Sequence, residues 1–251
     1  MKIVAVTQAR LGSTRLPRKI LKEVGGTTLL GLHIDRILKS KKVNALVVAT
    51  TTSAEDDEIE KFAQAKKLPS YRGSVNDVLD RFYQAVKLQN ADYIVRLTSD
   101  CPLIDATLID KIIAYADEKK LDYCSNTLDP HYPDGQDVEV FTFKALEKAW
   151  NEAKLSSERE HVTPFIWKNS SFKNGALFKS DNFNEGYDFG HLRITVDDLK
   201  DYEVVKNLVE ALGKDASWLE YASYLESHDA VREINSTINR NEGYSKSLEK
   251  E

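Results

Sequence analysis

Apolar residues in the first half of the chain alternate between short runs and helical spacing. Short runs predict buried strands at Ile3–Val6, Ala45–Thr50 and Tyr93–Leu97, with a further short strand at Pro69–Tyr71. Apolar residues that recur every three or four positions predict helices over Leu29–Leu38, Asp56–Lys66, Asp77–Leu88 and Leu108–Glu118. This order predicts an α/β fold in which a mixed, mostly parallel sheet carries helices on both faces.

The second half of the chain has a less regular order. Strand patterns occur at Gly135–Phe143, Ala176–Phe178 and His191–Val196, and helical patterns at Phe143–Glu152, Tyr202–Leu212 and Trp218–Ser227. Because no repeat or low-complexity linker interrupts the pattern, we expect a single domain over residues 1–234. Residues 235–251 are polar and charged, and we expect them to be a frayed tail or to pack at an oligomer interface.

Composition narrows the class of partner. The 251 residues carry a net charge of −5 and an isoelectric point near 5.7, which argues against nonspecific binding to nucleic acid. The two cysteines, Cys101 and Cys124, lack the spacing of a zinc site or a disulfide framework. We also find no secretory signal pattern and no apolar run long enough to span a membrane, so we expect a soluble, cytoplasmic protein.

The stretch that follows the first strand has the composition of a phosphate-binding loop. It reads ARLGSTRLPRK and contains one glycine, Gly12, among groups that suit an anion: Arg10, Ser13, Thr14, Arg15 and Lys19. A glycine lets the backbone approach an anion closely, and loop N–H groups with Arg and Lys side chains neutralise its charge. The spacing is neither that of a P-loop nor that of a dinucleotide-binding turn, and a solvated basic loop is the alternative.

Two later strands end in aspartates. The run YIVRL is followed by Ser99 and Asp100, and HLRITV by Asp197 and Asp198. Ligands of open α/β sheets bind at the carboxyl ends of the strands, and Mg²⁺ is bound by one or two carboxylates together with substrate phosphates. Asp100 and Asp197 are therefore candidate metal ligands, although Asp100 could instead cap a turn and Asp198 could replace Asp197. We expect Asp201 to be the N-cap of the helix that follows.

Three further stretches contain candidate binding residues. In YRGSVNDVLDR, Arg72 and Gly73 could face an anion, whereas Asp77 is equally explained by the dipole of its helix. In GQDVEV, Asp137 and Glu139 alternate with valines and point to one side of a strand, where they could bind sugar hydroxyls or form a solvated face. The stretch SEREHVTP contains Arg159 and His161, and a lone histidine such as His161 is more often structural than catalytic. The candidate substrate-binding residues are Asp137, Glu139, Arg159 and His161. Because a neighbouring carboxylate disfavours the thiolate, we reject Cys101 as a nucleophile.

Together these motifs resemble a known family. The stretch ARLGSTRLPRK is similar to the N-terminal signature of the sugar-acid cytidylyltransferases. The stretches RLTSDCPLID, YRGSVNDVLDRF, GQDVEVF, REHVTP and RITVDDLKDYE resemble the SpsF branch, named for spore coat polysaccharide biosynthesis and related to the synthetases of CMP-linked sialic acid and Kdo. The resemblance extends from Ile3 to about Tyr202.

The resemblance implies a fold, a reaction and a set of roles. It implies a Rossmann-like nucleotidyltransferase sheet of the glycosyltransferase-A type, CTP as donor, Mg²⁺ as cofactor, and transfer of CMP to a sugar acid with release of pyrophosphate. By position, Arg10, Ser13 and Lys19 would hold the triphosphate, and Arg10, Lys19 and Asp100 would serve catalysis. Asp100 and Asp197 would hold the metal, and Ala9 and Thr50 would lie at the base. No nucleic acid or membrane partner is implied, and a homodimer is possible.

One departure and several alternatives stay open. The related enzymes usually have a proline in V-D-T-P-E-D, where this chain reads VDDLKD, which leaves the ligand between Asp197 and Asp198 undecided. The acceptor cannot be matched. The alternatives are a nucleotidyltransferase that uses another nucleoside triphosphate, a glycosyltransferase, which would be expected to carry a D-x-D motif that this chain lacks, and a non-catalytic coat protein.

Overall fold

A seven-stranded sheet forms the centre of the protein in the computed structural model, which describes residues 1–249 and 251. The strand order is β5-β4-β1-β6-β8-β7-β9, and only β8 runs antiparallel to its neighbours. A separate two-stranded hairpin is formed by β2 and β3. The strands are β1 Ile3–Gln8, β2 Glu23–Val24, β3 Thr27–Thr28, β4 Ala45–Thr51, β5 Ser70–Gly73, β6 Tyr93–Thr98, β7 Tyr123–Ser125, β8 Glu139–Thr142 and β9 Ser180–Asn182.

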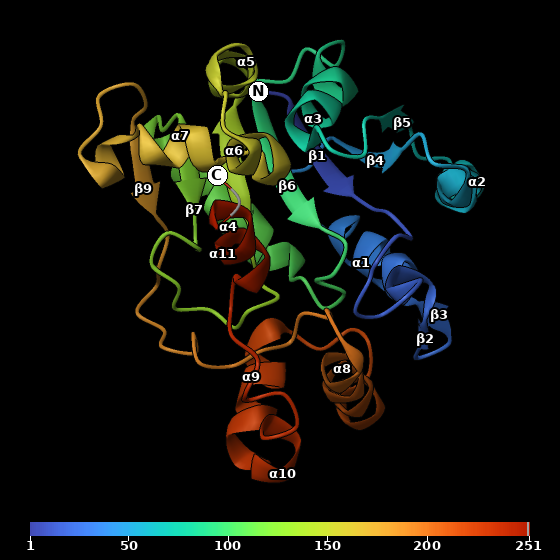
Figure 1. Ribbon diagram of the computed structural model, residues 1–251. Coiled ribbons are helices and arrows are strands. Elements are labelled where there is room, and N and C mark those ends of the chain that lie inside the picture. The colour runs from blue at the N-terminus through green and yellow to red at the C-terminus, as the bar shows by residue number, and fades with distance from the viewer. Residues whose placement is uncertain (250) are drawn as a thin grey trace.

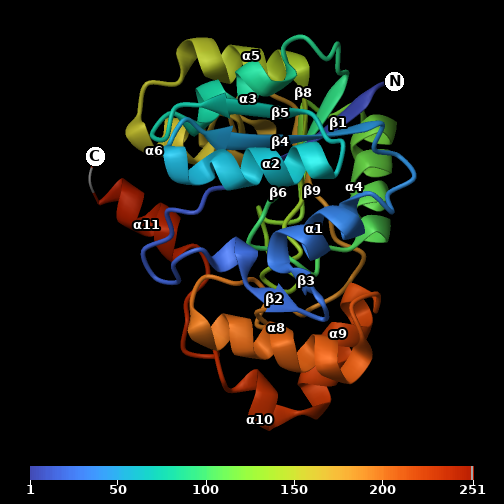
Figure 2. The same ribbon diagram turned by 90° about the vertical axis from the view of Figure 1, so that its right-hand side faces the viewer.

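Helices cover both faces of this sheet, as Figures 1 and 2 show. Successive residues of β1 point to opposite faces, so that Ile3 and Ala5 join one core while Val4 and Val6 join the other. The first core is closed by α1, α2, α4, α8 and α9, and the second by α3, α5 and α7. The helices are α1 Leu29–Ile37, α2 Asp57–Ala65, α3 Val78–Val86, α4 Ala106–Lys119, α5 Phe143–Glu152, α6 Ser156–His161, α7 Pro164–Lys168, α8 Leu199–Leu212, α9 Trp218–Ser227, α10 Asp229–Arg232 and α11 Glu242–Leu248.

The predicted fold class is confirmed: the sheet is mixed and mostly parallel, and the first four helices and their strands lie close to the expected positions. Among the described residues no helix is long and apolar enough to cross a membrane.

Three predicted strands in the second half were wrong or too long. Only Glu139–Thr142 of the expected strand 135–143 joins the sheet. The segment 191–196 is extended but forms one isolated bridge, between Asp134 and Arg193, and residues 176–178 contribute only the bridge of Phe178 to Ser170. The pattern misled because Leu192, Ile194 and Val196 are buried in the hydrophobic core without pairing to a strand of the sheet, and Val196 N instead donates to the carbonyl of Asp100 (2.8 Å), just after β6.

Gly135 allows two segments distant in sequence to lie against each other. It has a φ of +113°, and a Cβ placed there would lie 2.6 Å from the backbone N of Thr195. The carbonyl of Asp134 accepts hydrogen bonds from Ile194 N (2.7 Å) and Thr195 N (2.9 Å). Because both partners are backbone, neither can move aside for a side chain.

We therefore predict that Gly135→Ala lowers the free energy of unfolding by more than about 2 kcal/mol, since it adds a backbone clash to an unfavourable φ. Gly186→Ala is the matched control, because Gly186 also has a positive φ (+84°), whereas a Cβ added there would meet no described atom within 4 Å. It should cost only about 1 kcal/mol. Urea unfolding measures both, and equal losses for the two variants would contradict the clash.

Candidate functional site

The loop after β1 is held in place by a buried aspartate, Asp56. Leu11 N donates to Asp56 Oδ1 (2.8 Å), and the hydroxyl of Thr51 donates to the other oxygen of the same carboxylate. Asp56 is 1% exposed. There is also little space around Gly12, because a Cβ added there would lie 3.0 Å from Oε1 of Glu55. A loop fixed in this way presents its polar groups without a large entropic cost on binding.

Cations gather along this loop. Arg10 is exposed and has no ion pair among the described residues. Burial lowers the pKa of Arg81 to about 10, and the charge of Arg10 adds to that effect. Ser13 Oγ accepts from Leu16 N (3.4 Å) within the loop. Two guanidinium groups that repel each other favour an anion between them.

The ammonium group of Lys19 contacts both of the aspartates that were predicted as metal ligands. Its Nζ lies 2.9 Å from Asp197 Oδ1, 2.9 Å from the carbonyl oxygen of Val196 and 3.5 Å from Asp100 Oδ2. Burial would lower the pKa of Lys19, but the two carboxylates outweigh burial and raise it. The structure thus brings together Lys19, Asp100 and Asp197, three residues that the sequence singled out.

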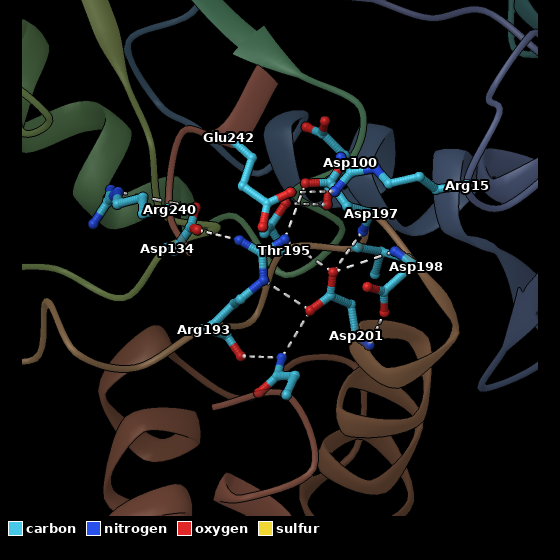
Figure 3. Close-up of polar contacts among 12 residues, drawn as sticks. Arg15, Asp100, Asp134, Arg193, Thr195, Asp197, Asp198, Asp201, Arg240 and Glu242 are labelled. Atoms are coloured by element: carbon cyan, nitrogen blue, oxygen red, sulfur yellow. Dashed lines mark hydrogen bonds and ion pairs between the residues drawn. The ribbon is translucent and has the colours of Figure 1, made fainter. Parts of the chain in front are cut away.

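Asp197 is the centre of a wider charged network (Figure 3). Its carboxylate also contacts Arg15 (3.0 Å) and Arg193 (3.0 Å). Burial would raise the pKa of Asp197, but Lys19 first, then Arg15 and Arg193, outweigh it and lower the pKa to about 2. Asp197 is therefore ionised at neutral pH.

A buried aspartate fixes the backbone under this network. Asp201 is 0% exposed, accepts from Arg193 Nε (2.8 Å) and accepts from Asp197 N (2.8 Å). The expectation that Asp201 is the N-cap of α8 was wrong. Asp198 is the N-cap, accepting from Lys200 N (2.9 Å), and Asp201 occupies the third helical position of a capping box. Since Asp198 is engaged with the helix, the geometry favours Asp197 over Asp198 as the carboxylate that faces Asp100.

These donors fit a divalent cation. Two carboxylates and the carbonyl of Val196 surround the point at which the Lys19 ammonium lies, and Mg²⁺ prefers such oxygen ligands. No group of three or more acidic, histidine or cysteine side chains in the described part of the chain is arranged to hold a metal by itself. A bound ion would therefore need phosphate oxygens or water to complete its ligands, and Lys19 would have to move away from Asp197.

A cavity of about 460 Å³ opens beside Asp100 and Asp197. Its walls include Asp137 and Glu139, as the alternation in GQDVEV predicted, and His161. Glu139 is buried and binds the guanidinium of Arg96, the hydroxyl of Tyr123 (2.6 Å) and the hydroxyl of Thr163 (2.5 Å). Burial lowers the pKa of His161, which favours its neutral form. The cavity is large enough for a small polar ligand.

Other predicted residues are not brought to the cavity. Arg72 donates to the carbonyls of Thr51 and Ser53 (both 2.9 Å) and pairs with Asp57 (2.6 Å), so its guanidinium is engaged with its own surroundings. Gly73 ends β5 beside it. Asp77 caps α3 and pairs with Arg159 (2.8 Å), which couples two candidates to each other rather than to the cavity.

The two residues expected at the base lie at the carboxyl ends of β1 and β4. Ala9 N donates to the carbonyl of Ala49 (3.0 Å), which joins the start of the loop to the neighbouring strand. Thr50 is fully buried, and its hydroxyl has no hydrogen-bond partner among the described residues.

Some site residues carried little signal in the sequence. Arg193 is a buried arginine inside an apolar run, which could have marked it as the partner of the aspartates that follow.

Asp134, Arg96 and Arg240 also belong to the site and carried no such signal. Burial and the charge of Asp137 raise the pKa of Asp134 to about 7, against the opposing effect of Arg240 and Arg193. Arg96 lies on β6 opposite Glu139, a pairing that depends on sheet register, and Arg240 reaches the site from the C-terminal tail.

Comparison with known proteins gives the family. A family model described as cytidylyltransferase matches residues 4–238. The chain belongs to the cytidylyltransferase family. It is therefore a nucleotidyltransferase, and its predicted resemblance to the SpsF branch is confirmed.

Individual relatives agree with this assignment. The cytidylyltransferase is 31% identical to the spore coat polysaccharide biosynthesis protein SpsF of Bacillus subtilis over 84% of this chain and 88% of that protein. The structure of a cytidylyltransferase from Leptospira borgpetersenii superposes with a TM-score of 0.86 at 34% identity, over 96% of this chain and 100% of that one. CMP:2-keto-3-deoxy-manno-octonic acid synthetase complexed with CTP shares the fold, with a TM-score of 0.62 at 17% identity over 84% and 99%.

The lowered pKa of Asp197 predicts a pH dependence of stability. The carboxylate has a pKa of about 2 in the folded cytidylyltransferase and about 3.9 when unfolded. It therefore stabilises the fold fully above about pH 4, and that contribution is lost as the pH falls toward 2. Asp197→Asn should lower the free energy of unfolding by about 1–2 kcal/mol at pH 7 and by progressively less between pH 5 and pH 3.

Urea unfolding at several pH values measures this difference. Asp198→Asn is the control, because asparagine caps a helix as well as aspartate does, and it should change the free energy of unfolding by less than about 0.5 kcal/mol. A deficit in Asp197→Asn that stays constant with pH would contradict the pKa assigned to this carboxylate.

Proposed function

We propose that this cytidylyltransferase transfers CMP from CTP to the anomeric hydroxyl of a sugar acid, with release of pyrophosphate, in the synthesis of a surface polysaccharide or glycan. The observation that carries the proposal is the meeting of Lys19, Asp100 and Asp197 beside a cation-rich loop and at the edge of a polar cavity. That arrangement suits a metal-bound triphosphate on one side and a hydroxylated acceptor on the other. A structurally similar synthetase that is complexed with CTP supports the choice of donor.

In the proposed reaction, the acceptor oxygen forms a bond to the α-phosphorus of CTP. The bond from that phosphorus to the bridging oxygen of the β-phosphate breaks, pyrophosphate leaves with the electron pair, and the hydroxyl proton passes to solvent. Lys19 and Arg10 neutralise the β- and γ-phosphates, and Ser13 and the N–H groups near Gly12 orient them. Asp100 and Asp197 are the proposed ligands of a divalent ion, Mg²⁺, which when bound would neutralise charge on the α-phosphate.

Binding would rearrange the contacts of Lys19. In the present structure its ammonium lies between Asp100 and Asp197, the position that a cation would take. A metal-bound triphosphate brings both a replacement cation for the two carboxylates and an anion for the ammonium. Lys19 can thus exchange carboxylate partners for phosphate partners without leaving any charge unpaired.

We place the base of CTP near Ala9 and Thr50, and we propose that the cavity beside Asp137, Glu139 and His161 receives the acceptor. Arg72, Gly73, Asp77 and Arg159 then act by shaping the surrounding loops. Arg96 lines the cavity, and its buried Nε has no hydrogen-bond partner in the part of the chain that the structure describes, so its guanidinium is a candidate for the acceptor carboxylate. The homodimer and the absence of nucleic acid and membrane partners stay predictions.

The donor is tested by comparing nucleotides. We predict that CTP with Mg²⁺ raises the melting temperature by several degrees, while ATP, GTP and UTP with Mg²⁺ raise it by much less, because only a ligand bound to the folded state stabilises it. Pyrophosphate release from CTP is then measured with a panel of 3-deoxy-2-keto sugar acids. A larger shift with another nucleotide would overturn CTP as the donor, and pyrophosphate release with none of the acids would overturn the acceptor class.

Substitution tests the metal and phosphate roles. Asp100→Asn should lower kcat/KM by at least 100-fold and leave the melting temperature nearly unchanged, because Asp100 is partly exposed. Lys19→Ala should raise the KM for CTP by 10-fold or more. Asp35→Asn is the control and should behave as wild type, because it alters only a surface ion pair between Asp35 of α1 and Lys66 at the end of α2. Near-normal activity of Asp100→Asn would refute the metal assignment.

A further inference from the structure

The C-terminal segment lies across the site rather than extending into solvent. Asn235 is 3% exposed, and its side-chain amide donates to Asp201 Oδ1 (2.9 Å) and to the carbonyl of Arg193 (3.2 Å). At the far end, Ser247 Oγ donates to Glu160 (2.9 Å) and lies 3.0 Å from His161 Nε2. Figure 1 shows α11, in red, beside α6 and well above α10. The family model ends at residue 238, so the part of this segment that crosses the cavity lies beyond it.

Arg240 connects this segment to two aspartates of the site. Its Nη2 lies 2.5 Å from Asp137 Oδ1, and its Nη1 donates to the carbonyl of Tyr132 (3.1 Å). Its Nε is 4.0 Å from Oδ1 of Asp134, which Figure 3 shows beside it. Asp134 has a second cation, Arg193. Among the described residues Arg240 is the one cation within 4.0 Å of Asp137.

The residues that follow Arg240 form a wall of the cavity. They are Asn241, Glu242, Gly243 and Tyr244. The ring of Tyr244 packs edge-on against the rings of His161 (5.1 Å between centroids) and Trp167 (6.0 Å), which also line the cavity. Glu242 lies 3.6 Å from Arg15 of the phosphate-binding loop. The wall is thus attached at one side to the acceptor cavity and at the other to the donor loop.

The charges of the cavity explain why an arginine is needed at this place. Burial raises the pKa of Asp137, and Glu139 and Asp100 add to that effect, while Arg240 opposes it. A sugar acid would bring another negative charge into the same cavity. Without Arg240, Asp137 would repel such an acceptor or take up a proton and lose its fixed orientation.

We propose that Arg240 is a positioning residue for the acceptor: it holds Asp137 in place and keeps the wall formed by residues 241–244 closed over the acceptor cavity. The inference rests on the proposed function for the identity of the acceptor. It adds to that function that a segment beyond the residues matched by the family model completes the acceptor side of the site. Among the described residues of the donor side, this segment reaches Arg15 alone, through Glu242.

The test separates the two substrates kinetically. The acceptor is whichever sugar acid of the panel the wild-type enzyme uses. Arg240→Ala should raise the KM for that acceptor by at least 10-fold while the KM for CTP changes by less than 2-fold. Arg240→Lys, which keeps the charge but loses the paired N–H groups, should recover part of the loss. Arg232→Ala is the matched control and should behave as wild type, because Arg232 lies on α10 and pairs with Asp229 of the same helix and with Glu226 of α9.

A second readout does not need an acceptor. Amide hydrogen exchange in residues 241–249 should become at least 10-fold faster in Arg240→Ala than in wild type and stay unchanged in Arg232→Ala. Tyr244→Ala, which removes the partly exposed ring of the wall and leaves Arg240 in place, should also raise the KM for the acceptor selectively; it decides the kinetic test if Arg240→Ala does not fold.

The outcomes distinguish the inference from the function on which it rests. If wild type uses no sugar acid of the panel, the proposed function fails and the exchange measurement alone decides whether Arg240 closes the wall. If wild type is active, equal losses for CTP and acceptor would show a merely structural role, and an unchanged acceptor KM with unchanged exchange would overturn the inference.

Discussion

Two carboxylates that would repel each other lie on either side of one ammonium group, and the rest of the site depends on that arrangement. Asp100 lies just after β6, Asp197 ends a segment nearly a hundred residues later, and Lys19 follows the loop after β1. Bringing these chain segments together costs electrostatic free energy unless a cation lies between the carboxylates. The lysine provides that cation in the structure, and a divalent ion with a triphosphate is proposed to replace it.

The supports of this arrangement are buried charges with complete sets of partners. Arg193 binds Asp134, Asp197 and Asp201 at once, and Asp201 in turn fixes the backbone of Asp197. Removing one member would leave another buried charge unpaired, which is costly. The orientation of Asp197 is therefore set by the network behind it as much as by Lys19, which suits a site that has to bind a charged ligand in one geometry.

The sequence predicted those parts of the structure that depend on local pattern. Buried parallel strands have apolar residues on both faces, so β1, β4 and β6 were visible as short apolar runs, and Asp100 and Asp197 were visible because polar residues follow such runs directly. The remainder depends on partners distant in sequence. Arg72 and Arg159 have the right chemistry for an anion but are engaged by Asp57 and Asp77, and no local pattern gives such pairings. Arg240 is one arginine in a polar tail until the fold places it beside Asp137.

The most direct test of the account is a crystal structure of the protein with CTP and Mn²⁺, in which anomalous scattering locates the metal. We predict one metal peak bound by the carboxylates of Asp100 and Asp197 and by a phosphate oxygen of CTP, with the Lys19 ammonium moved from Asp197 to the phosphates. A metal bound elsewhere, or a Lys19 that keeps its contact with Asp197 while CTP is bound, would contradict the central claim.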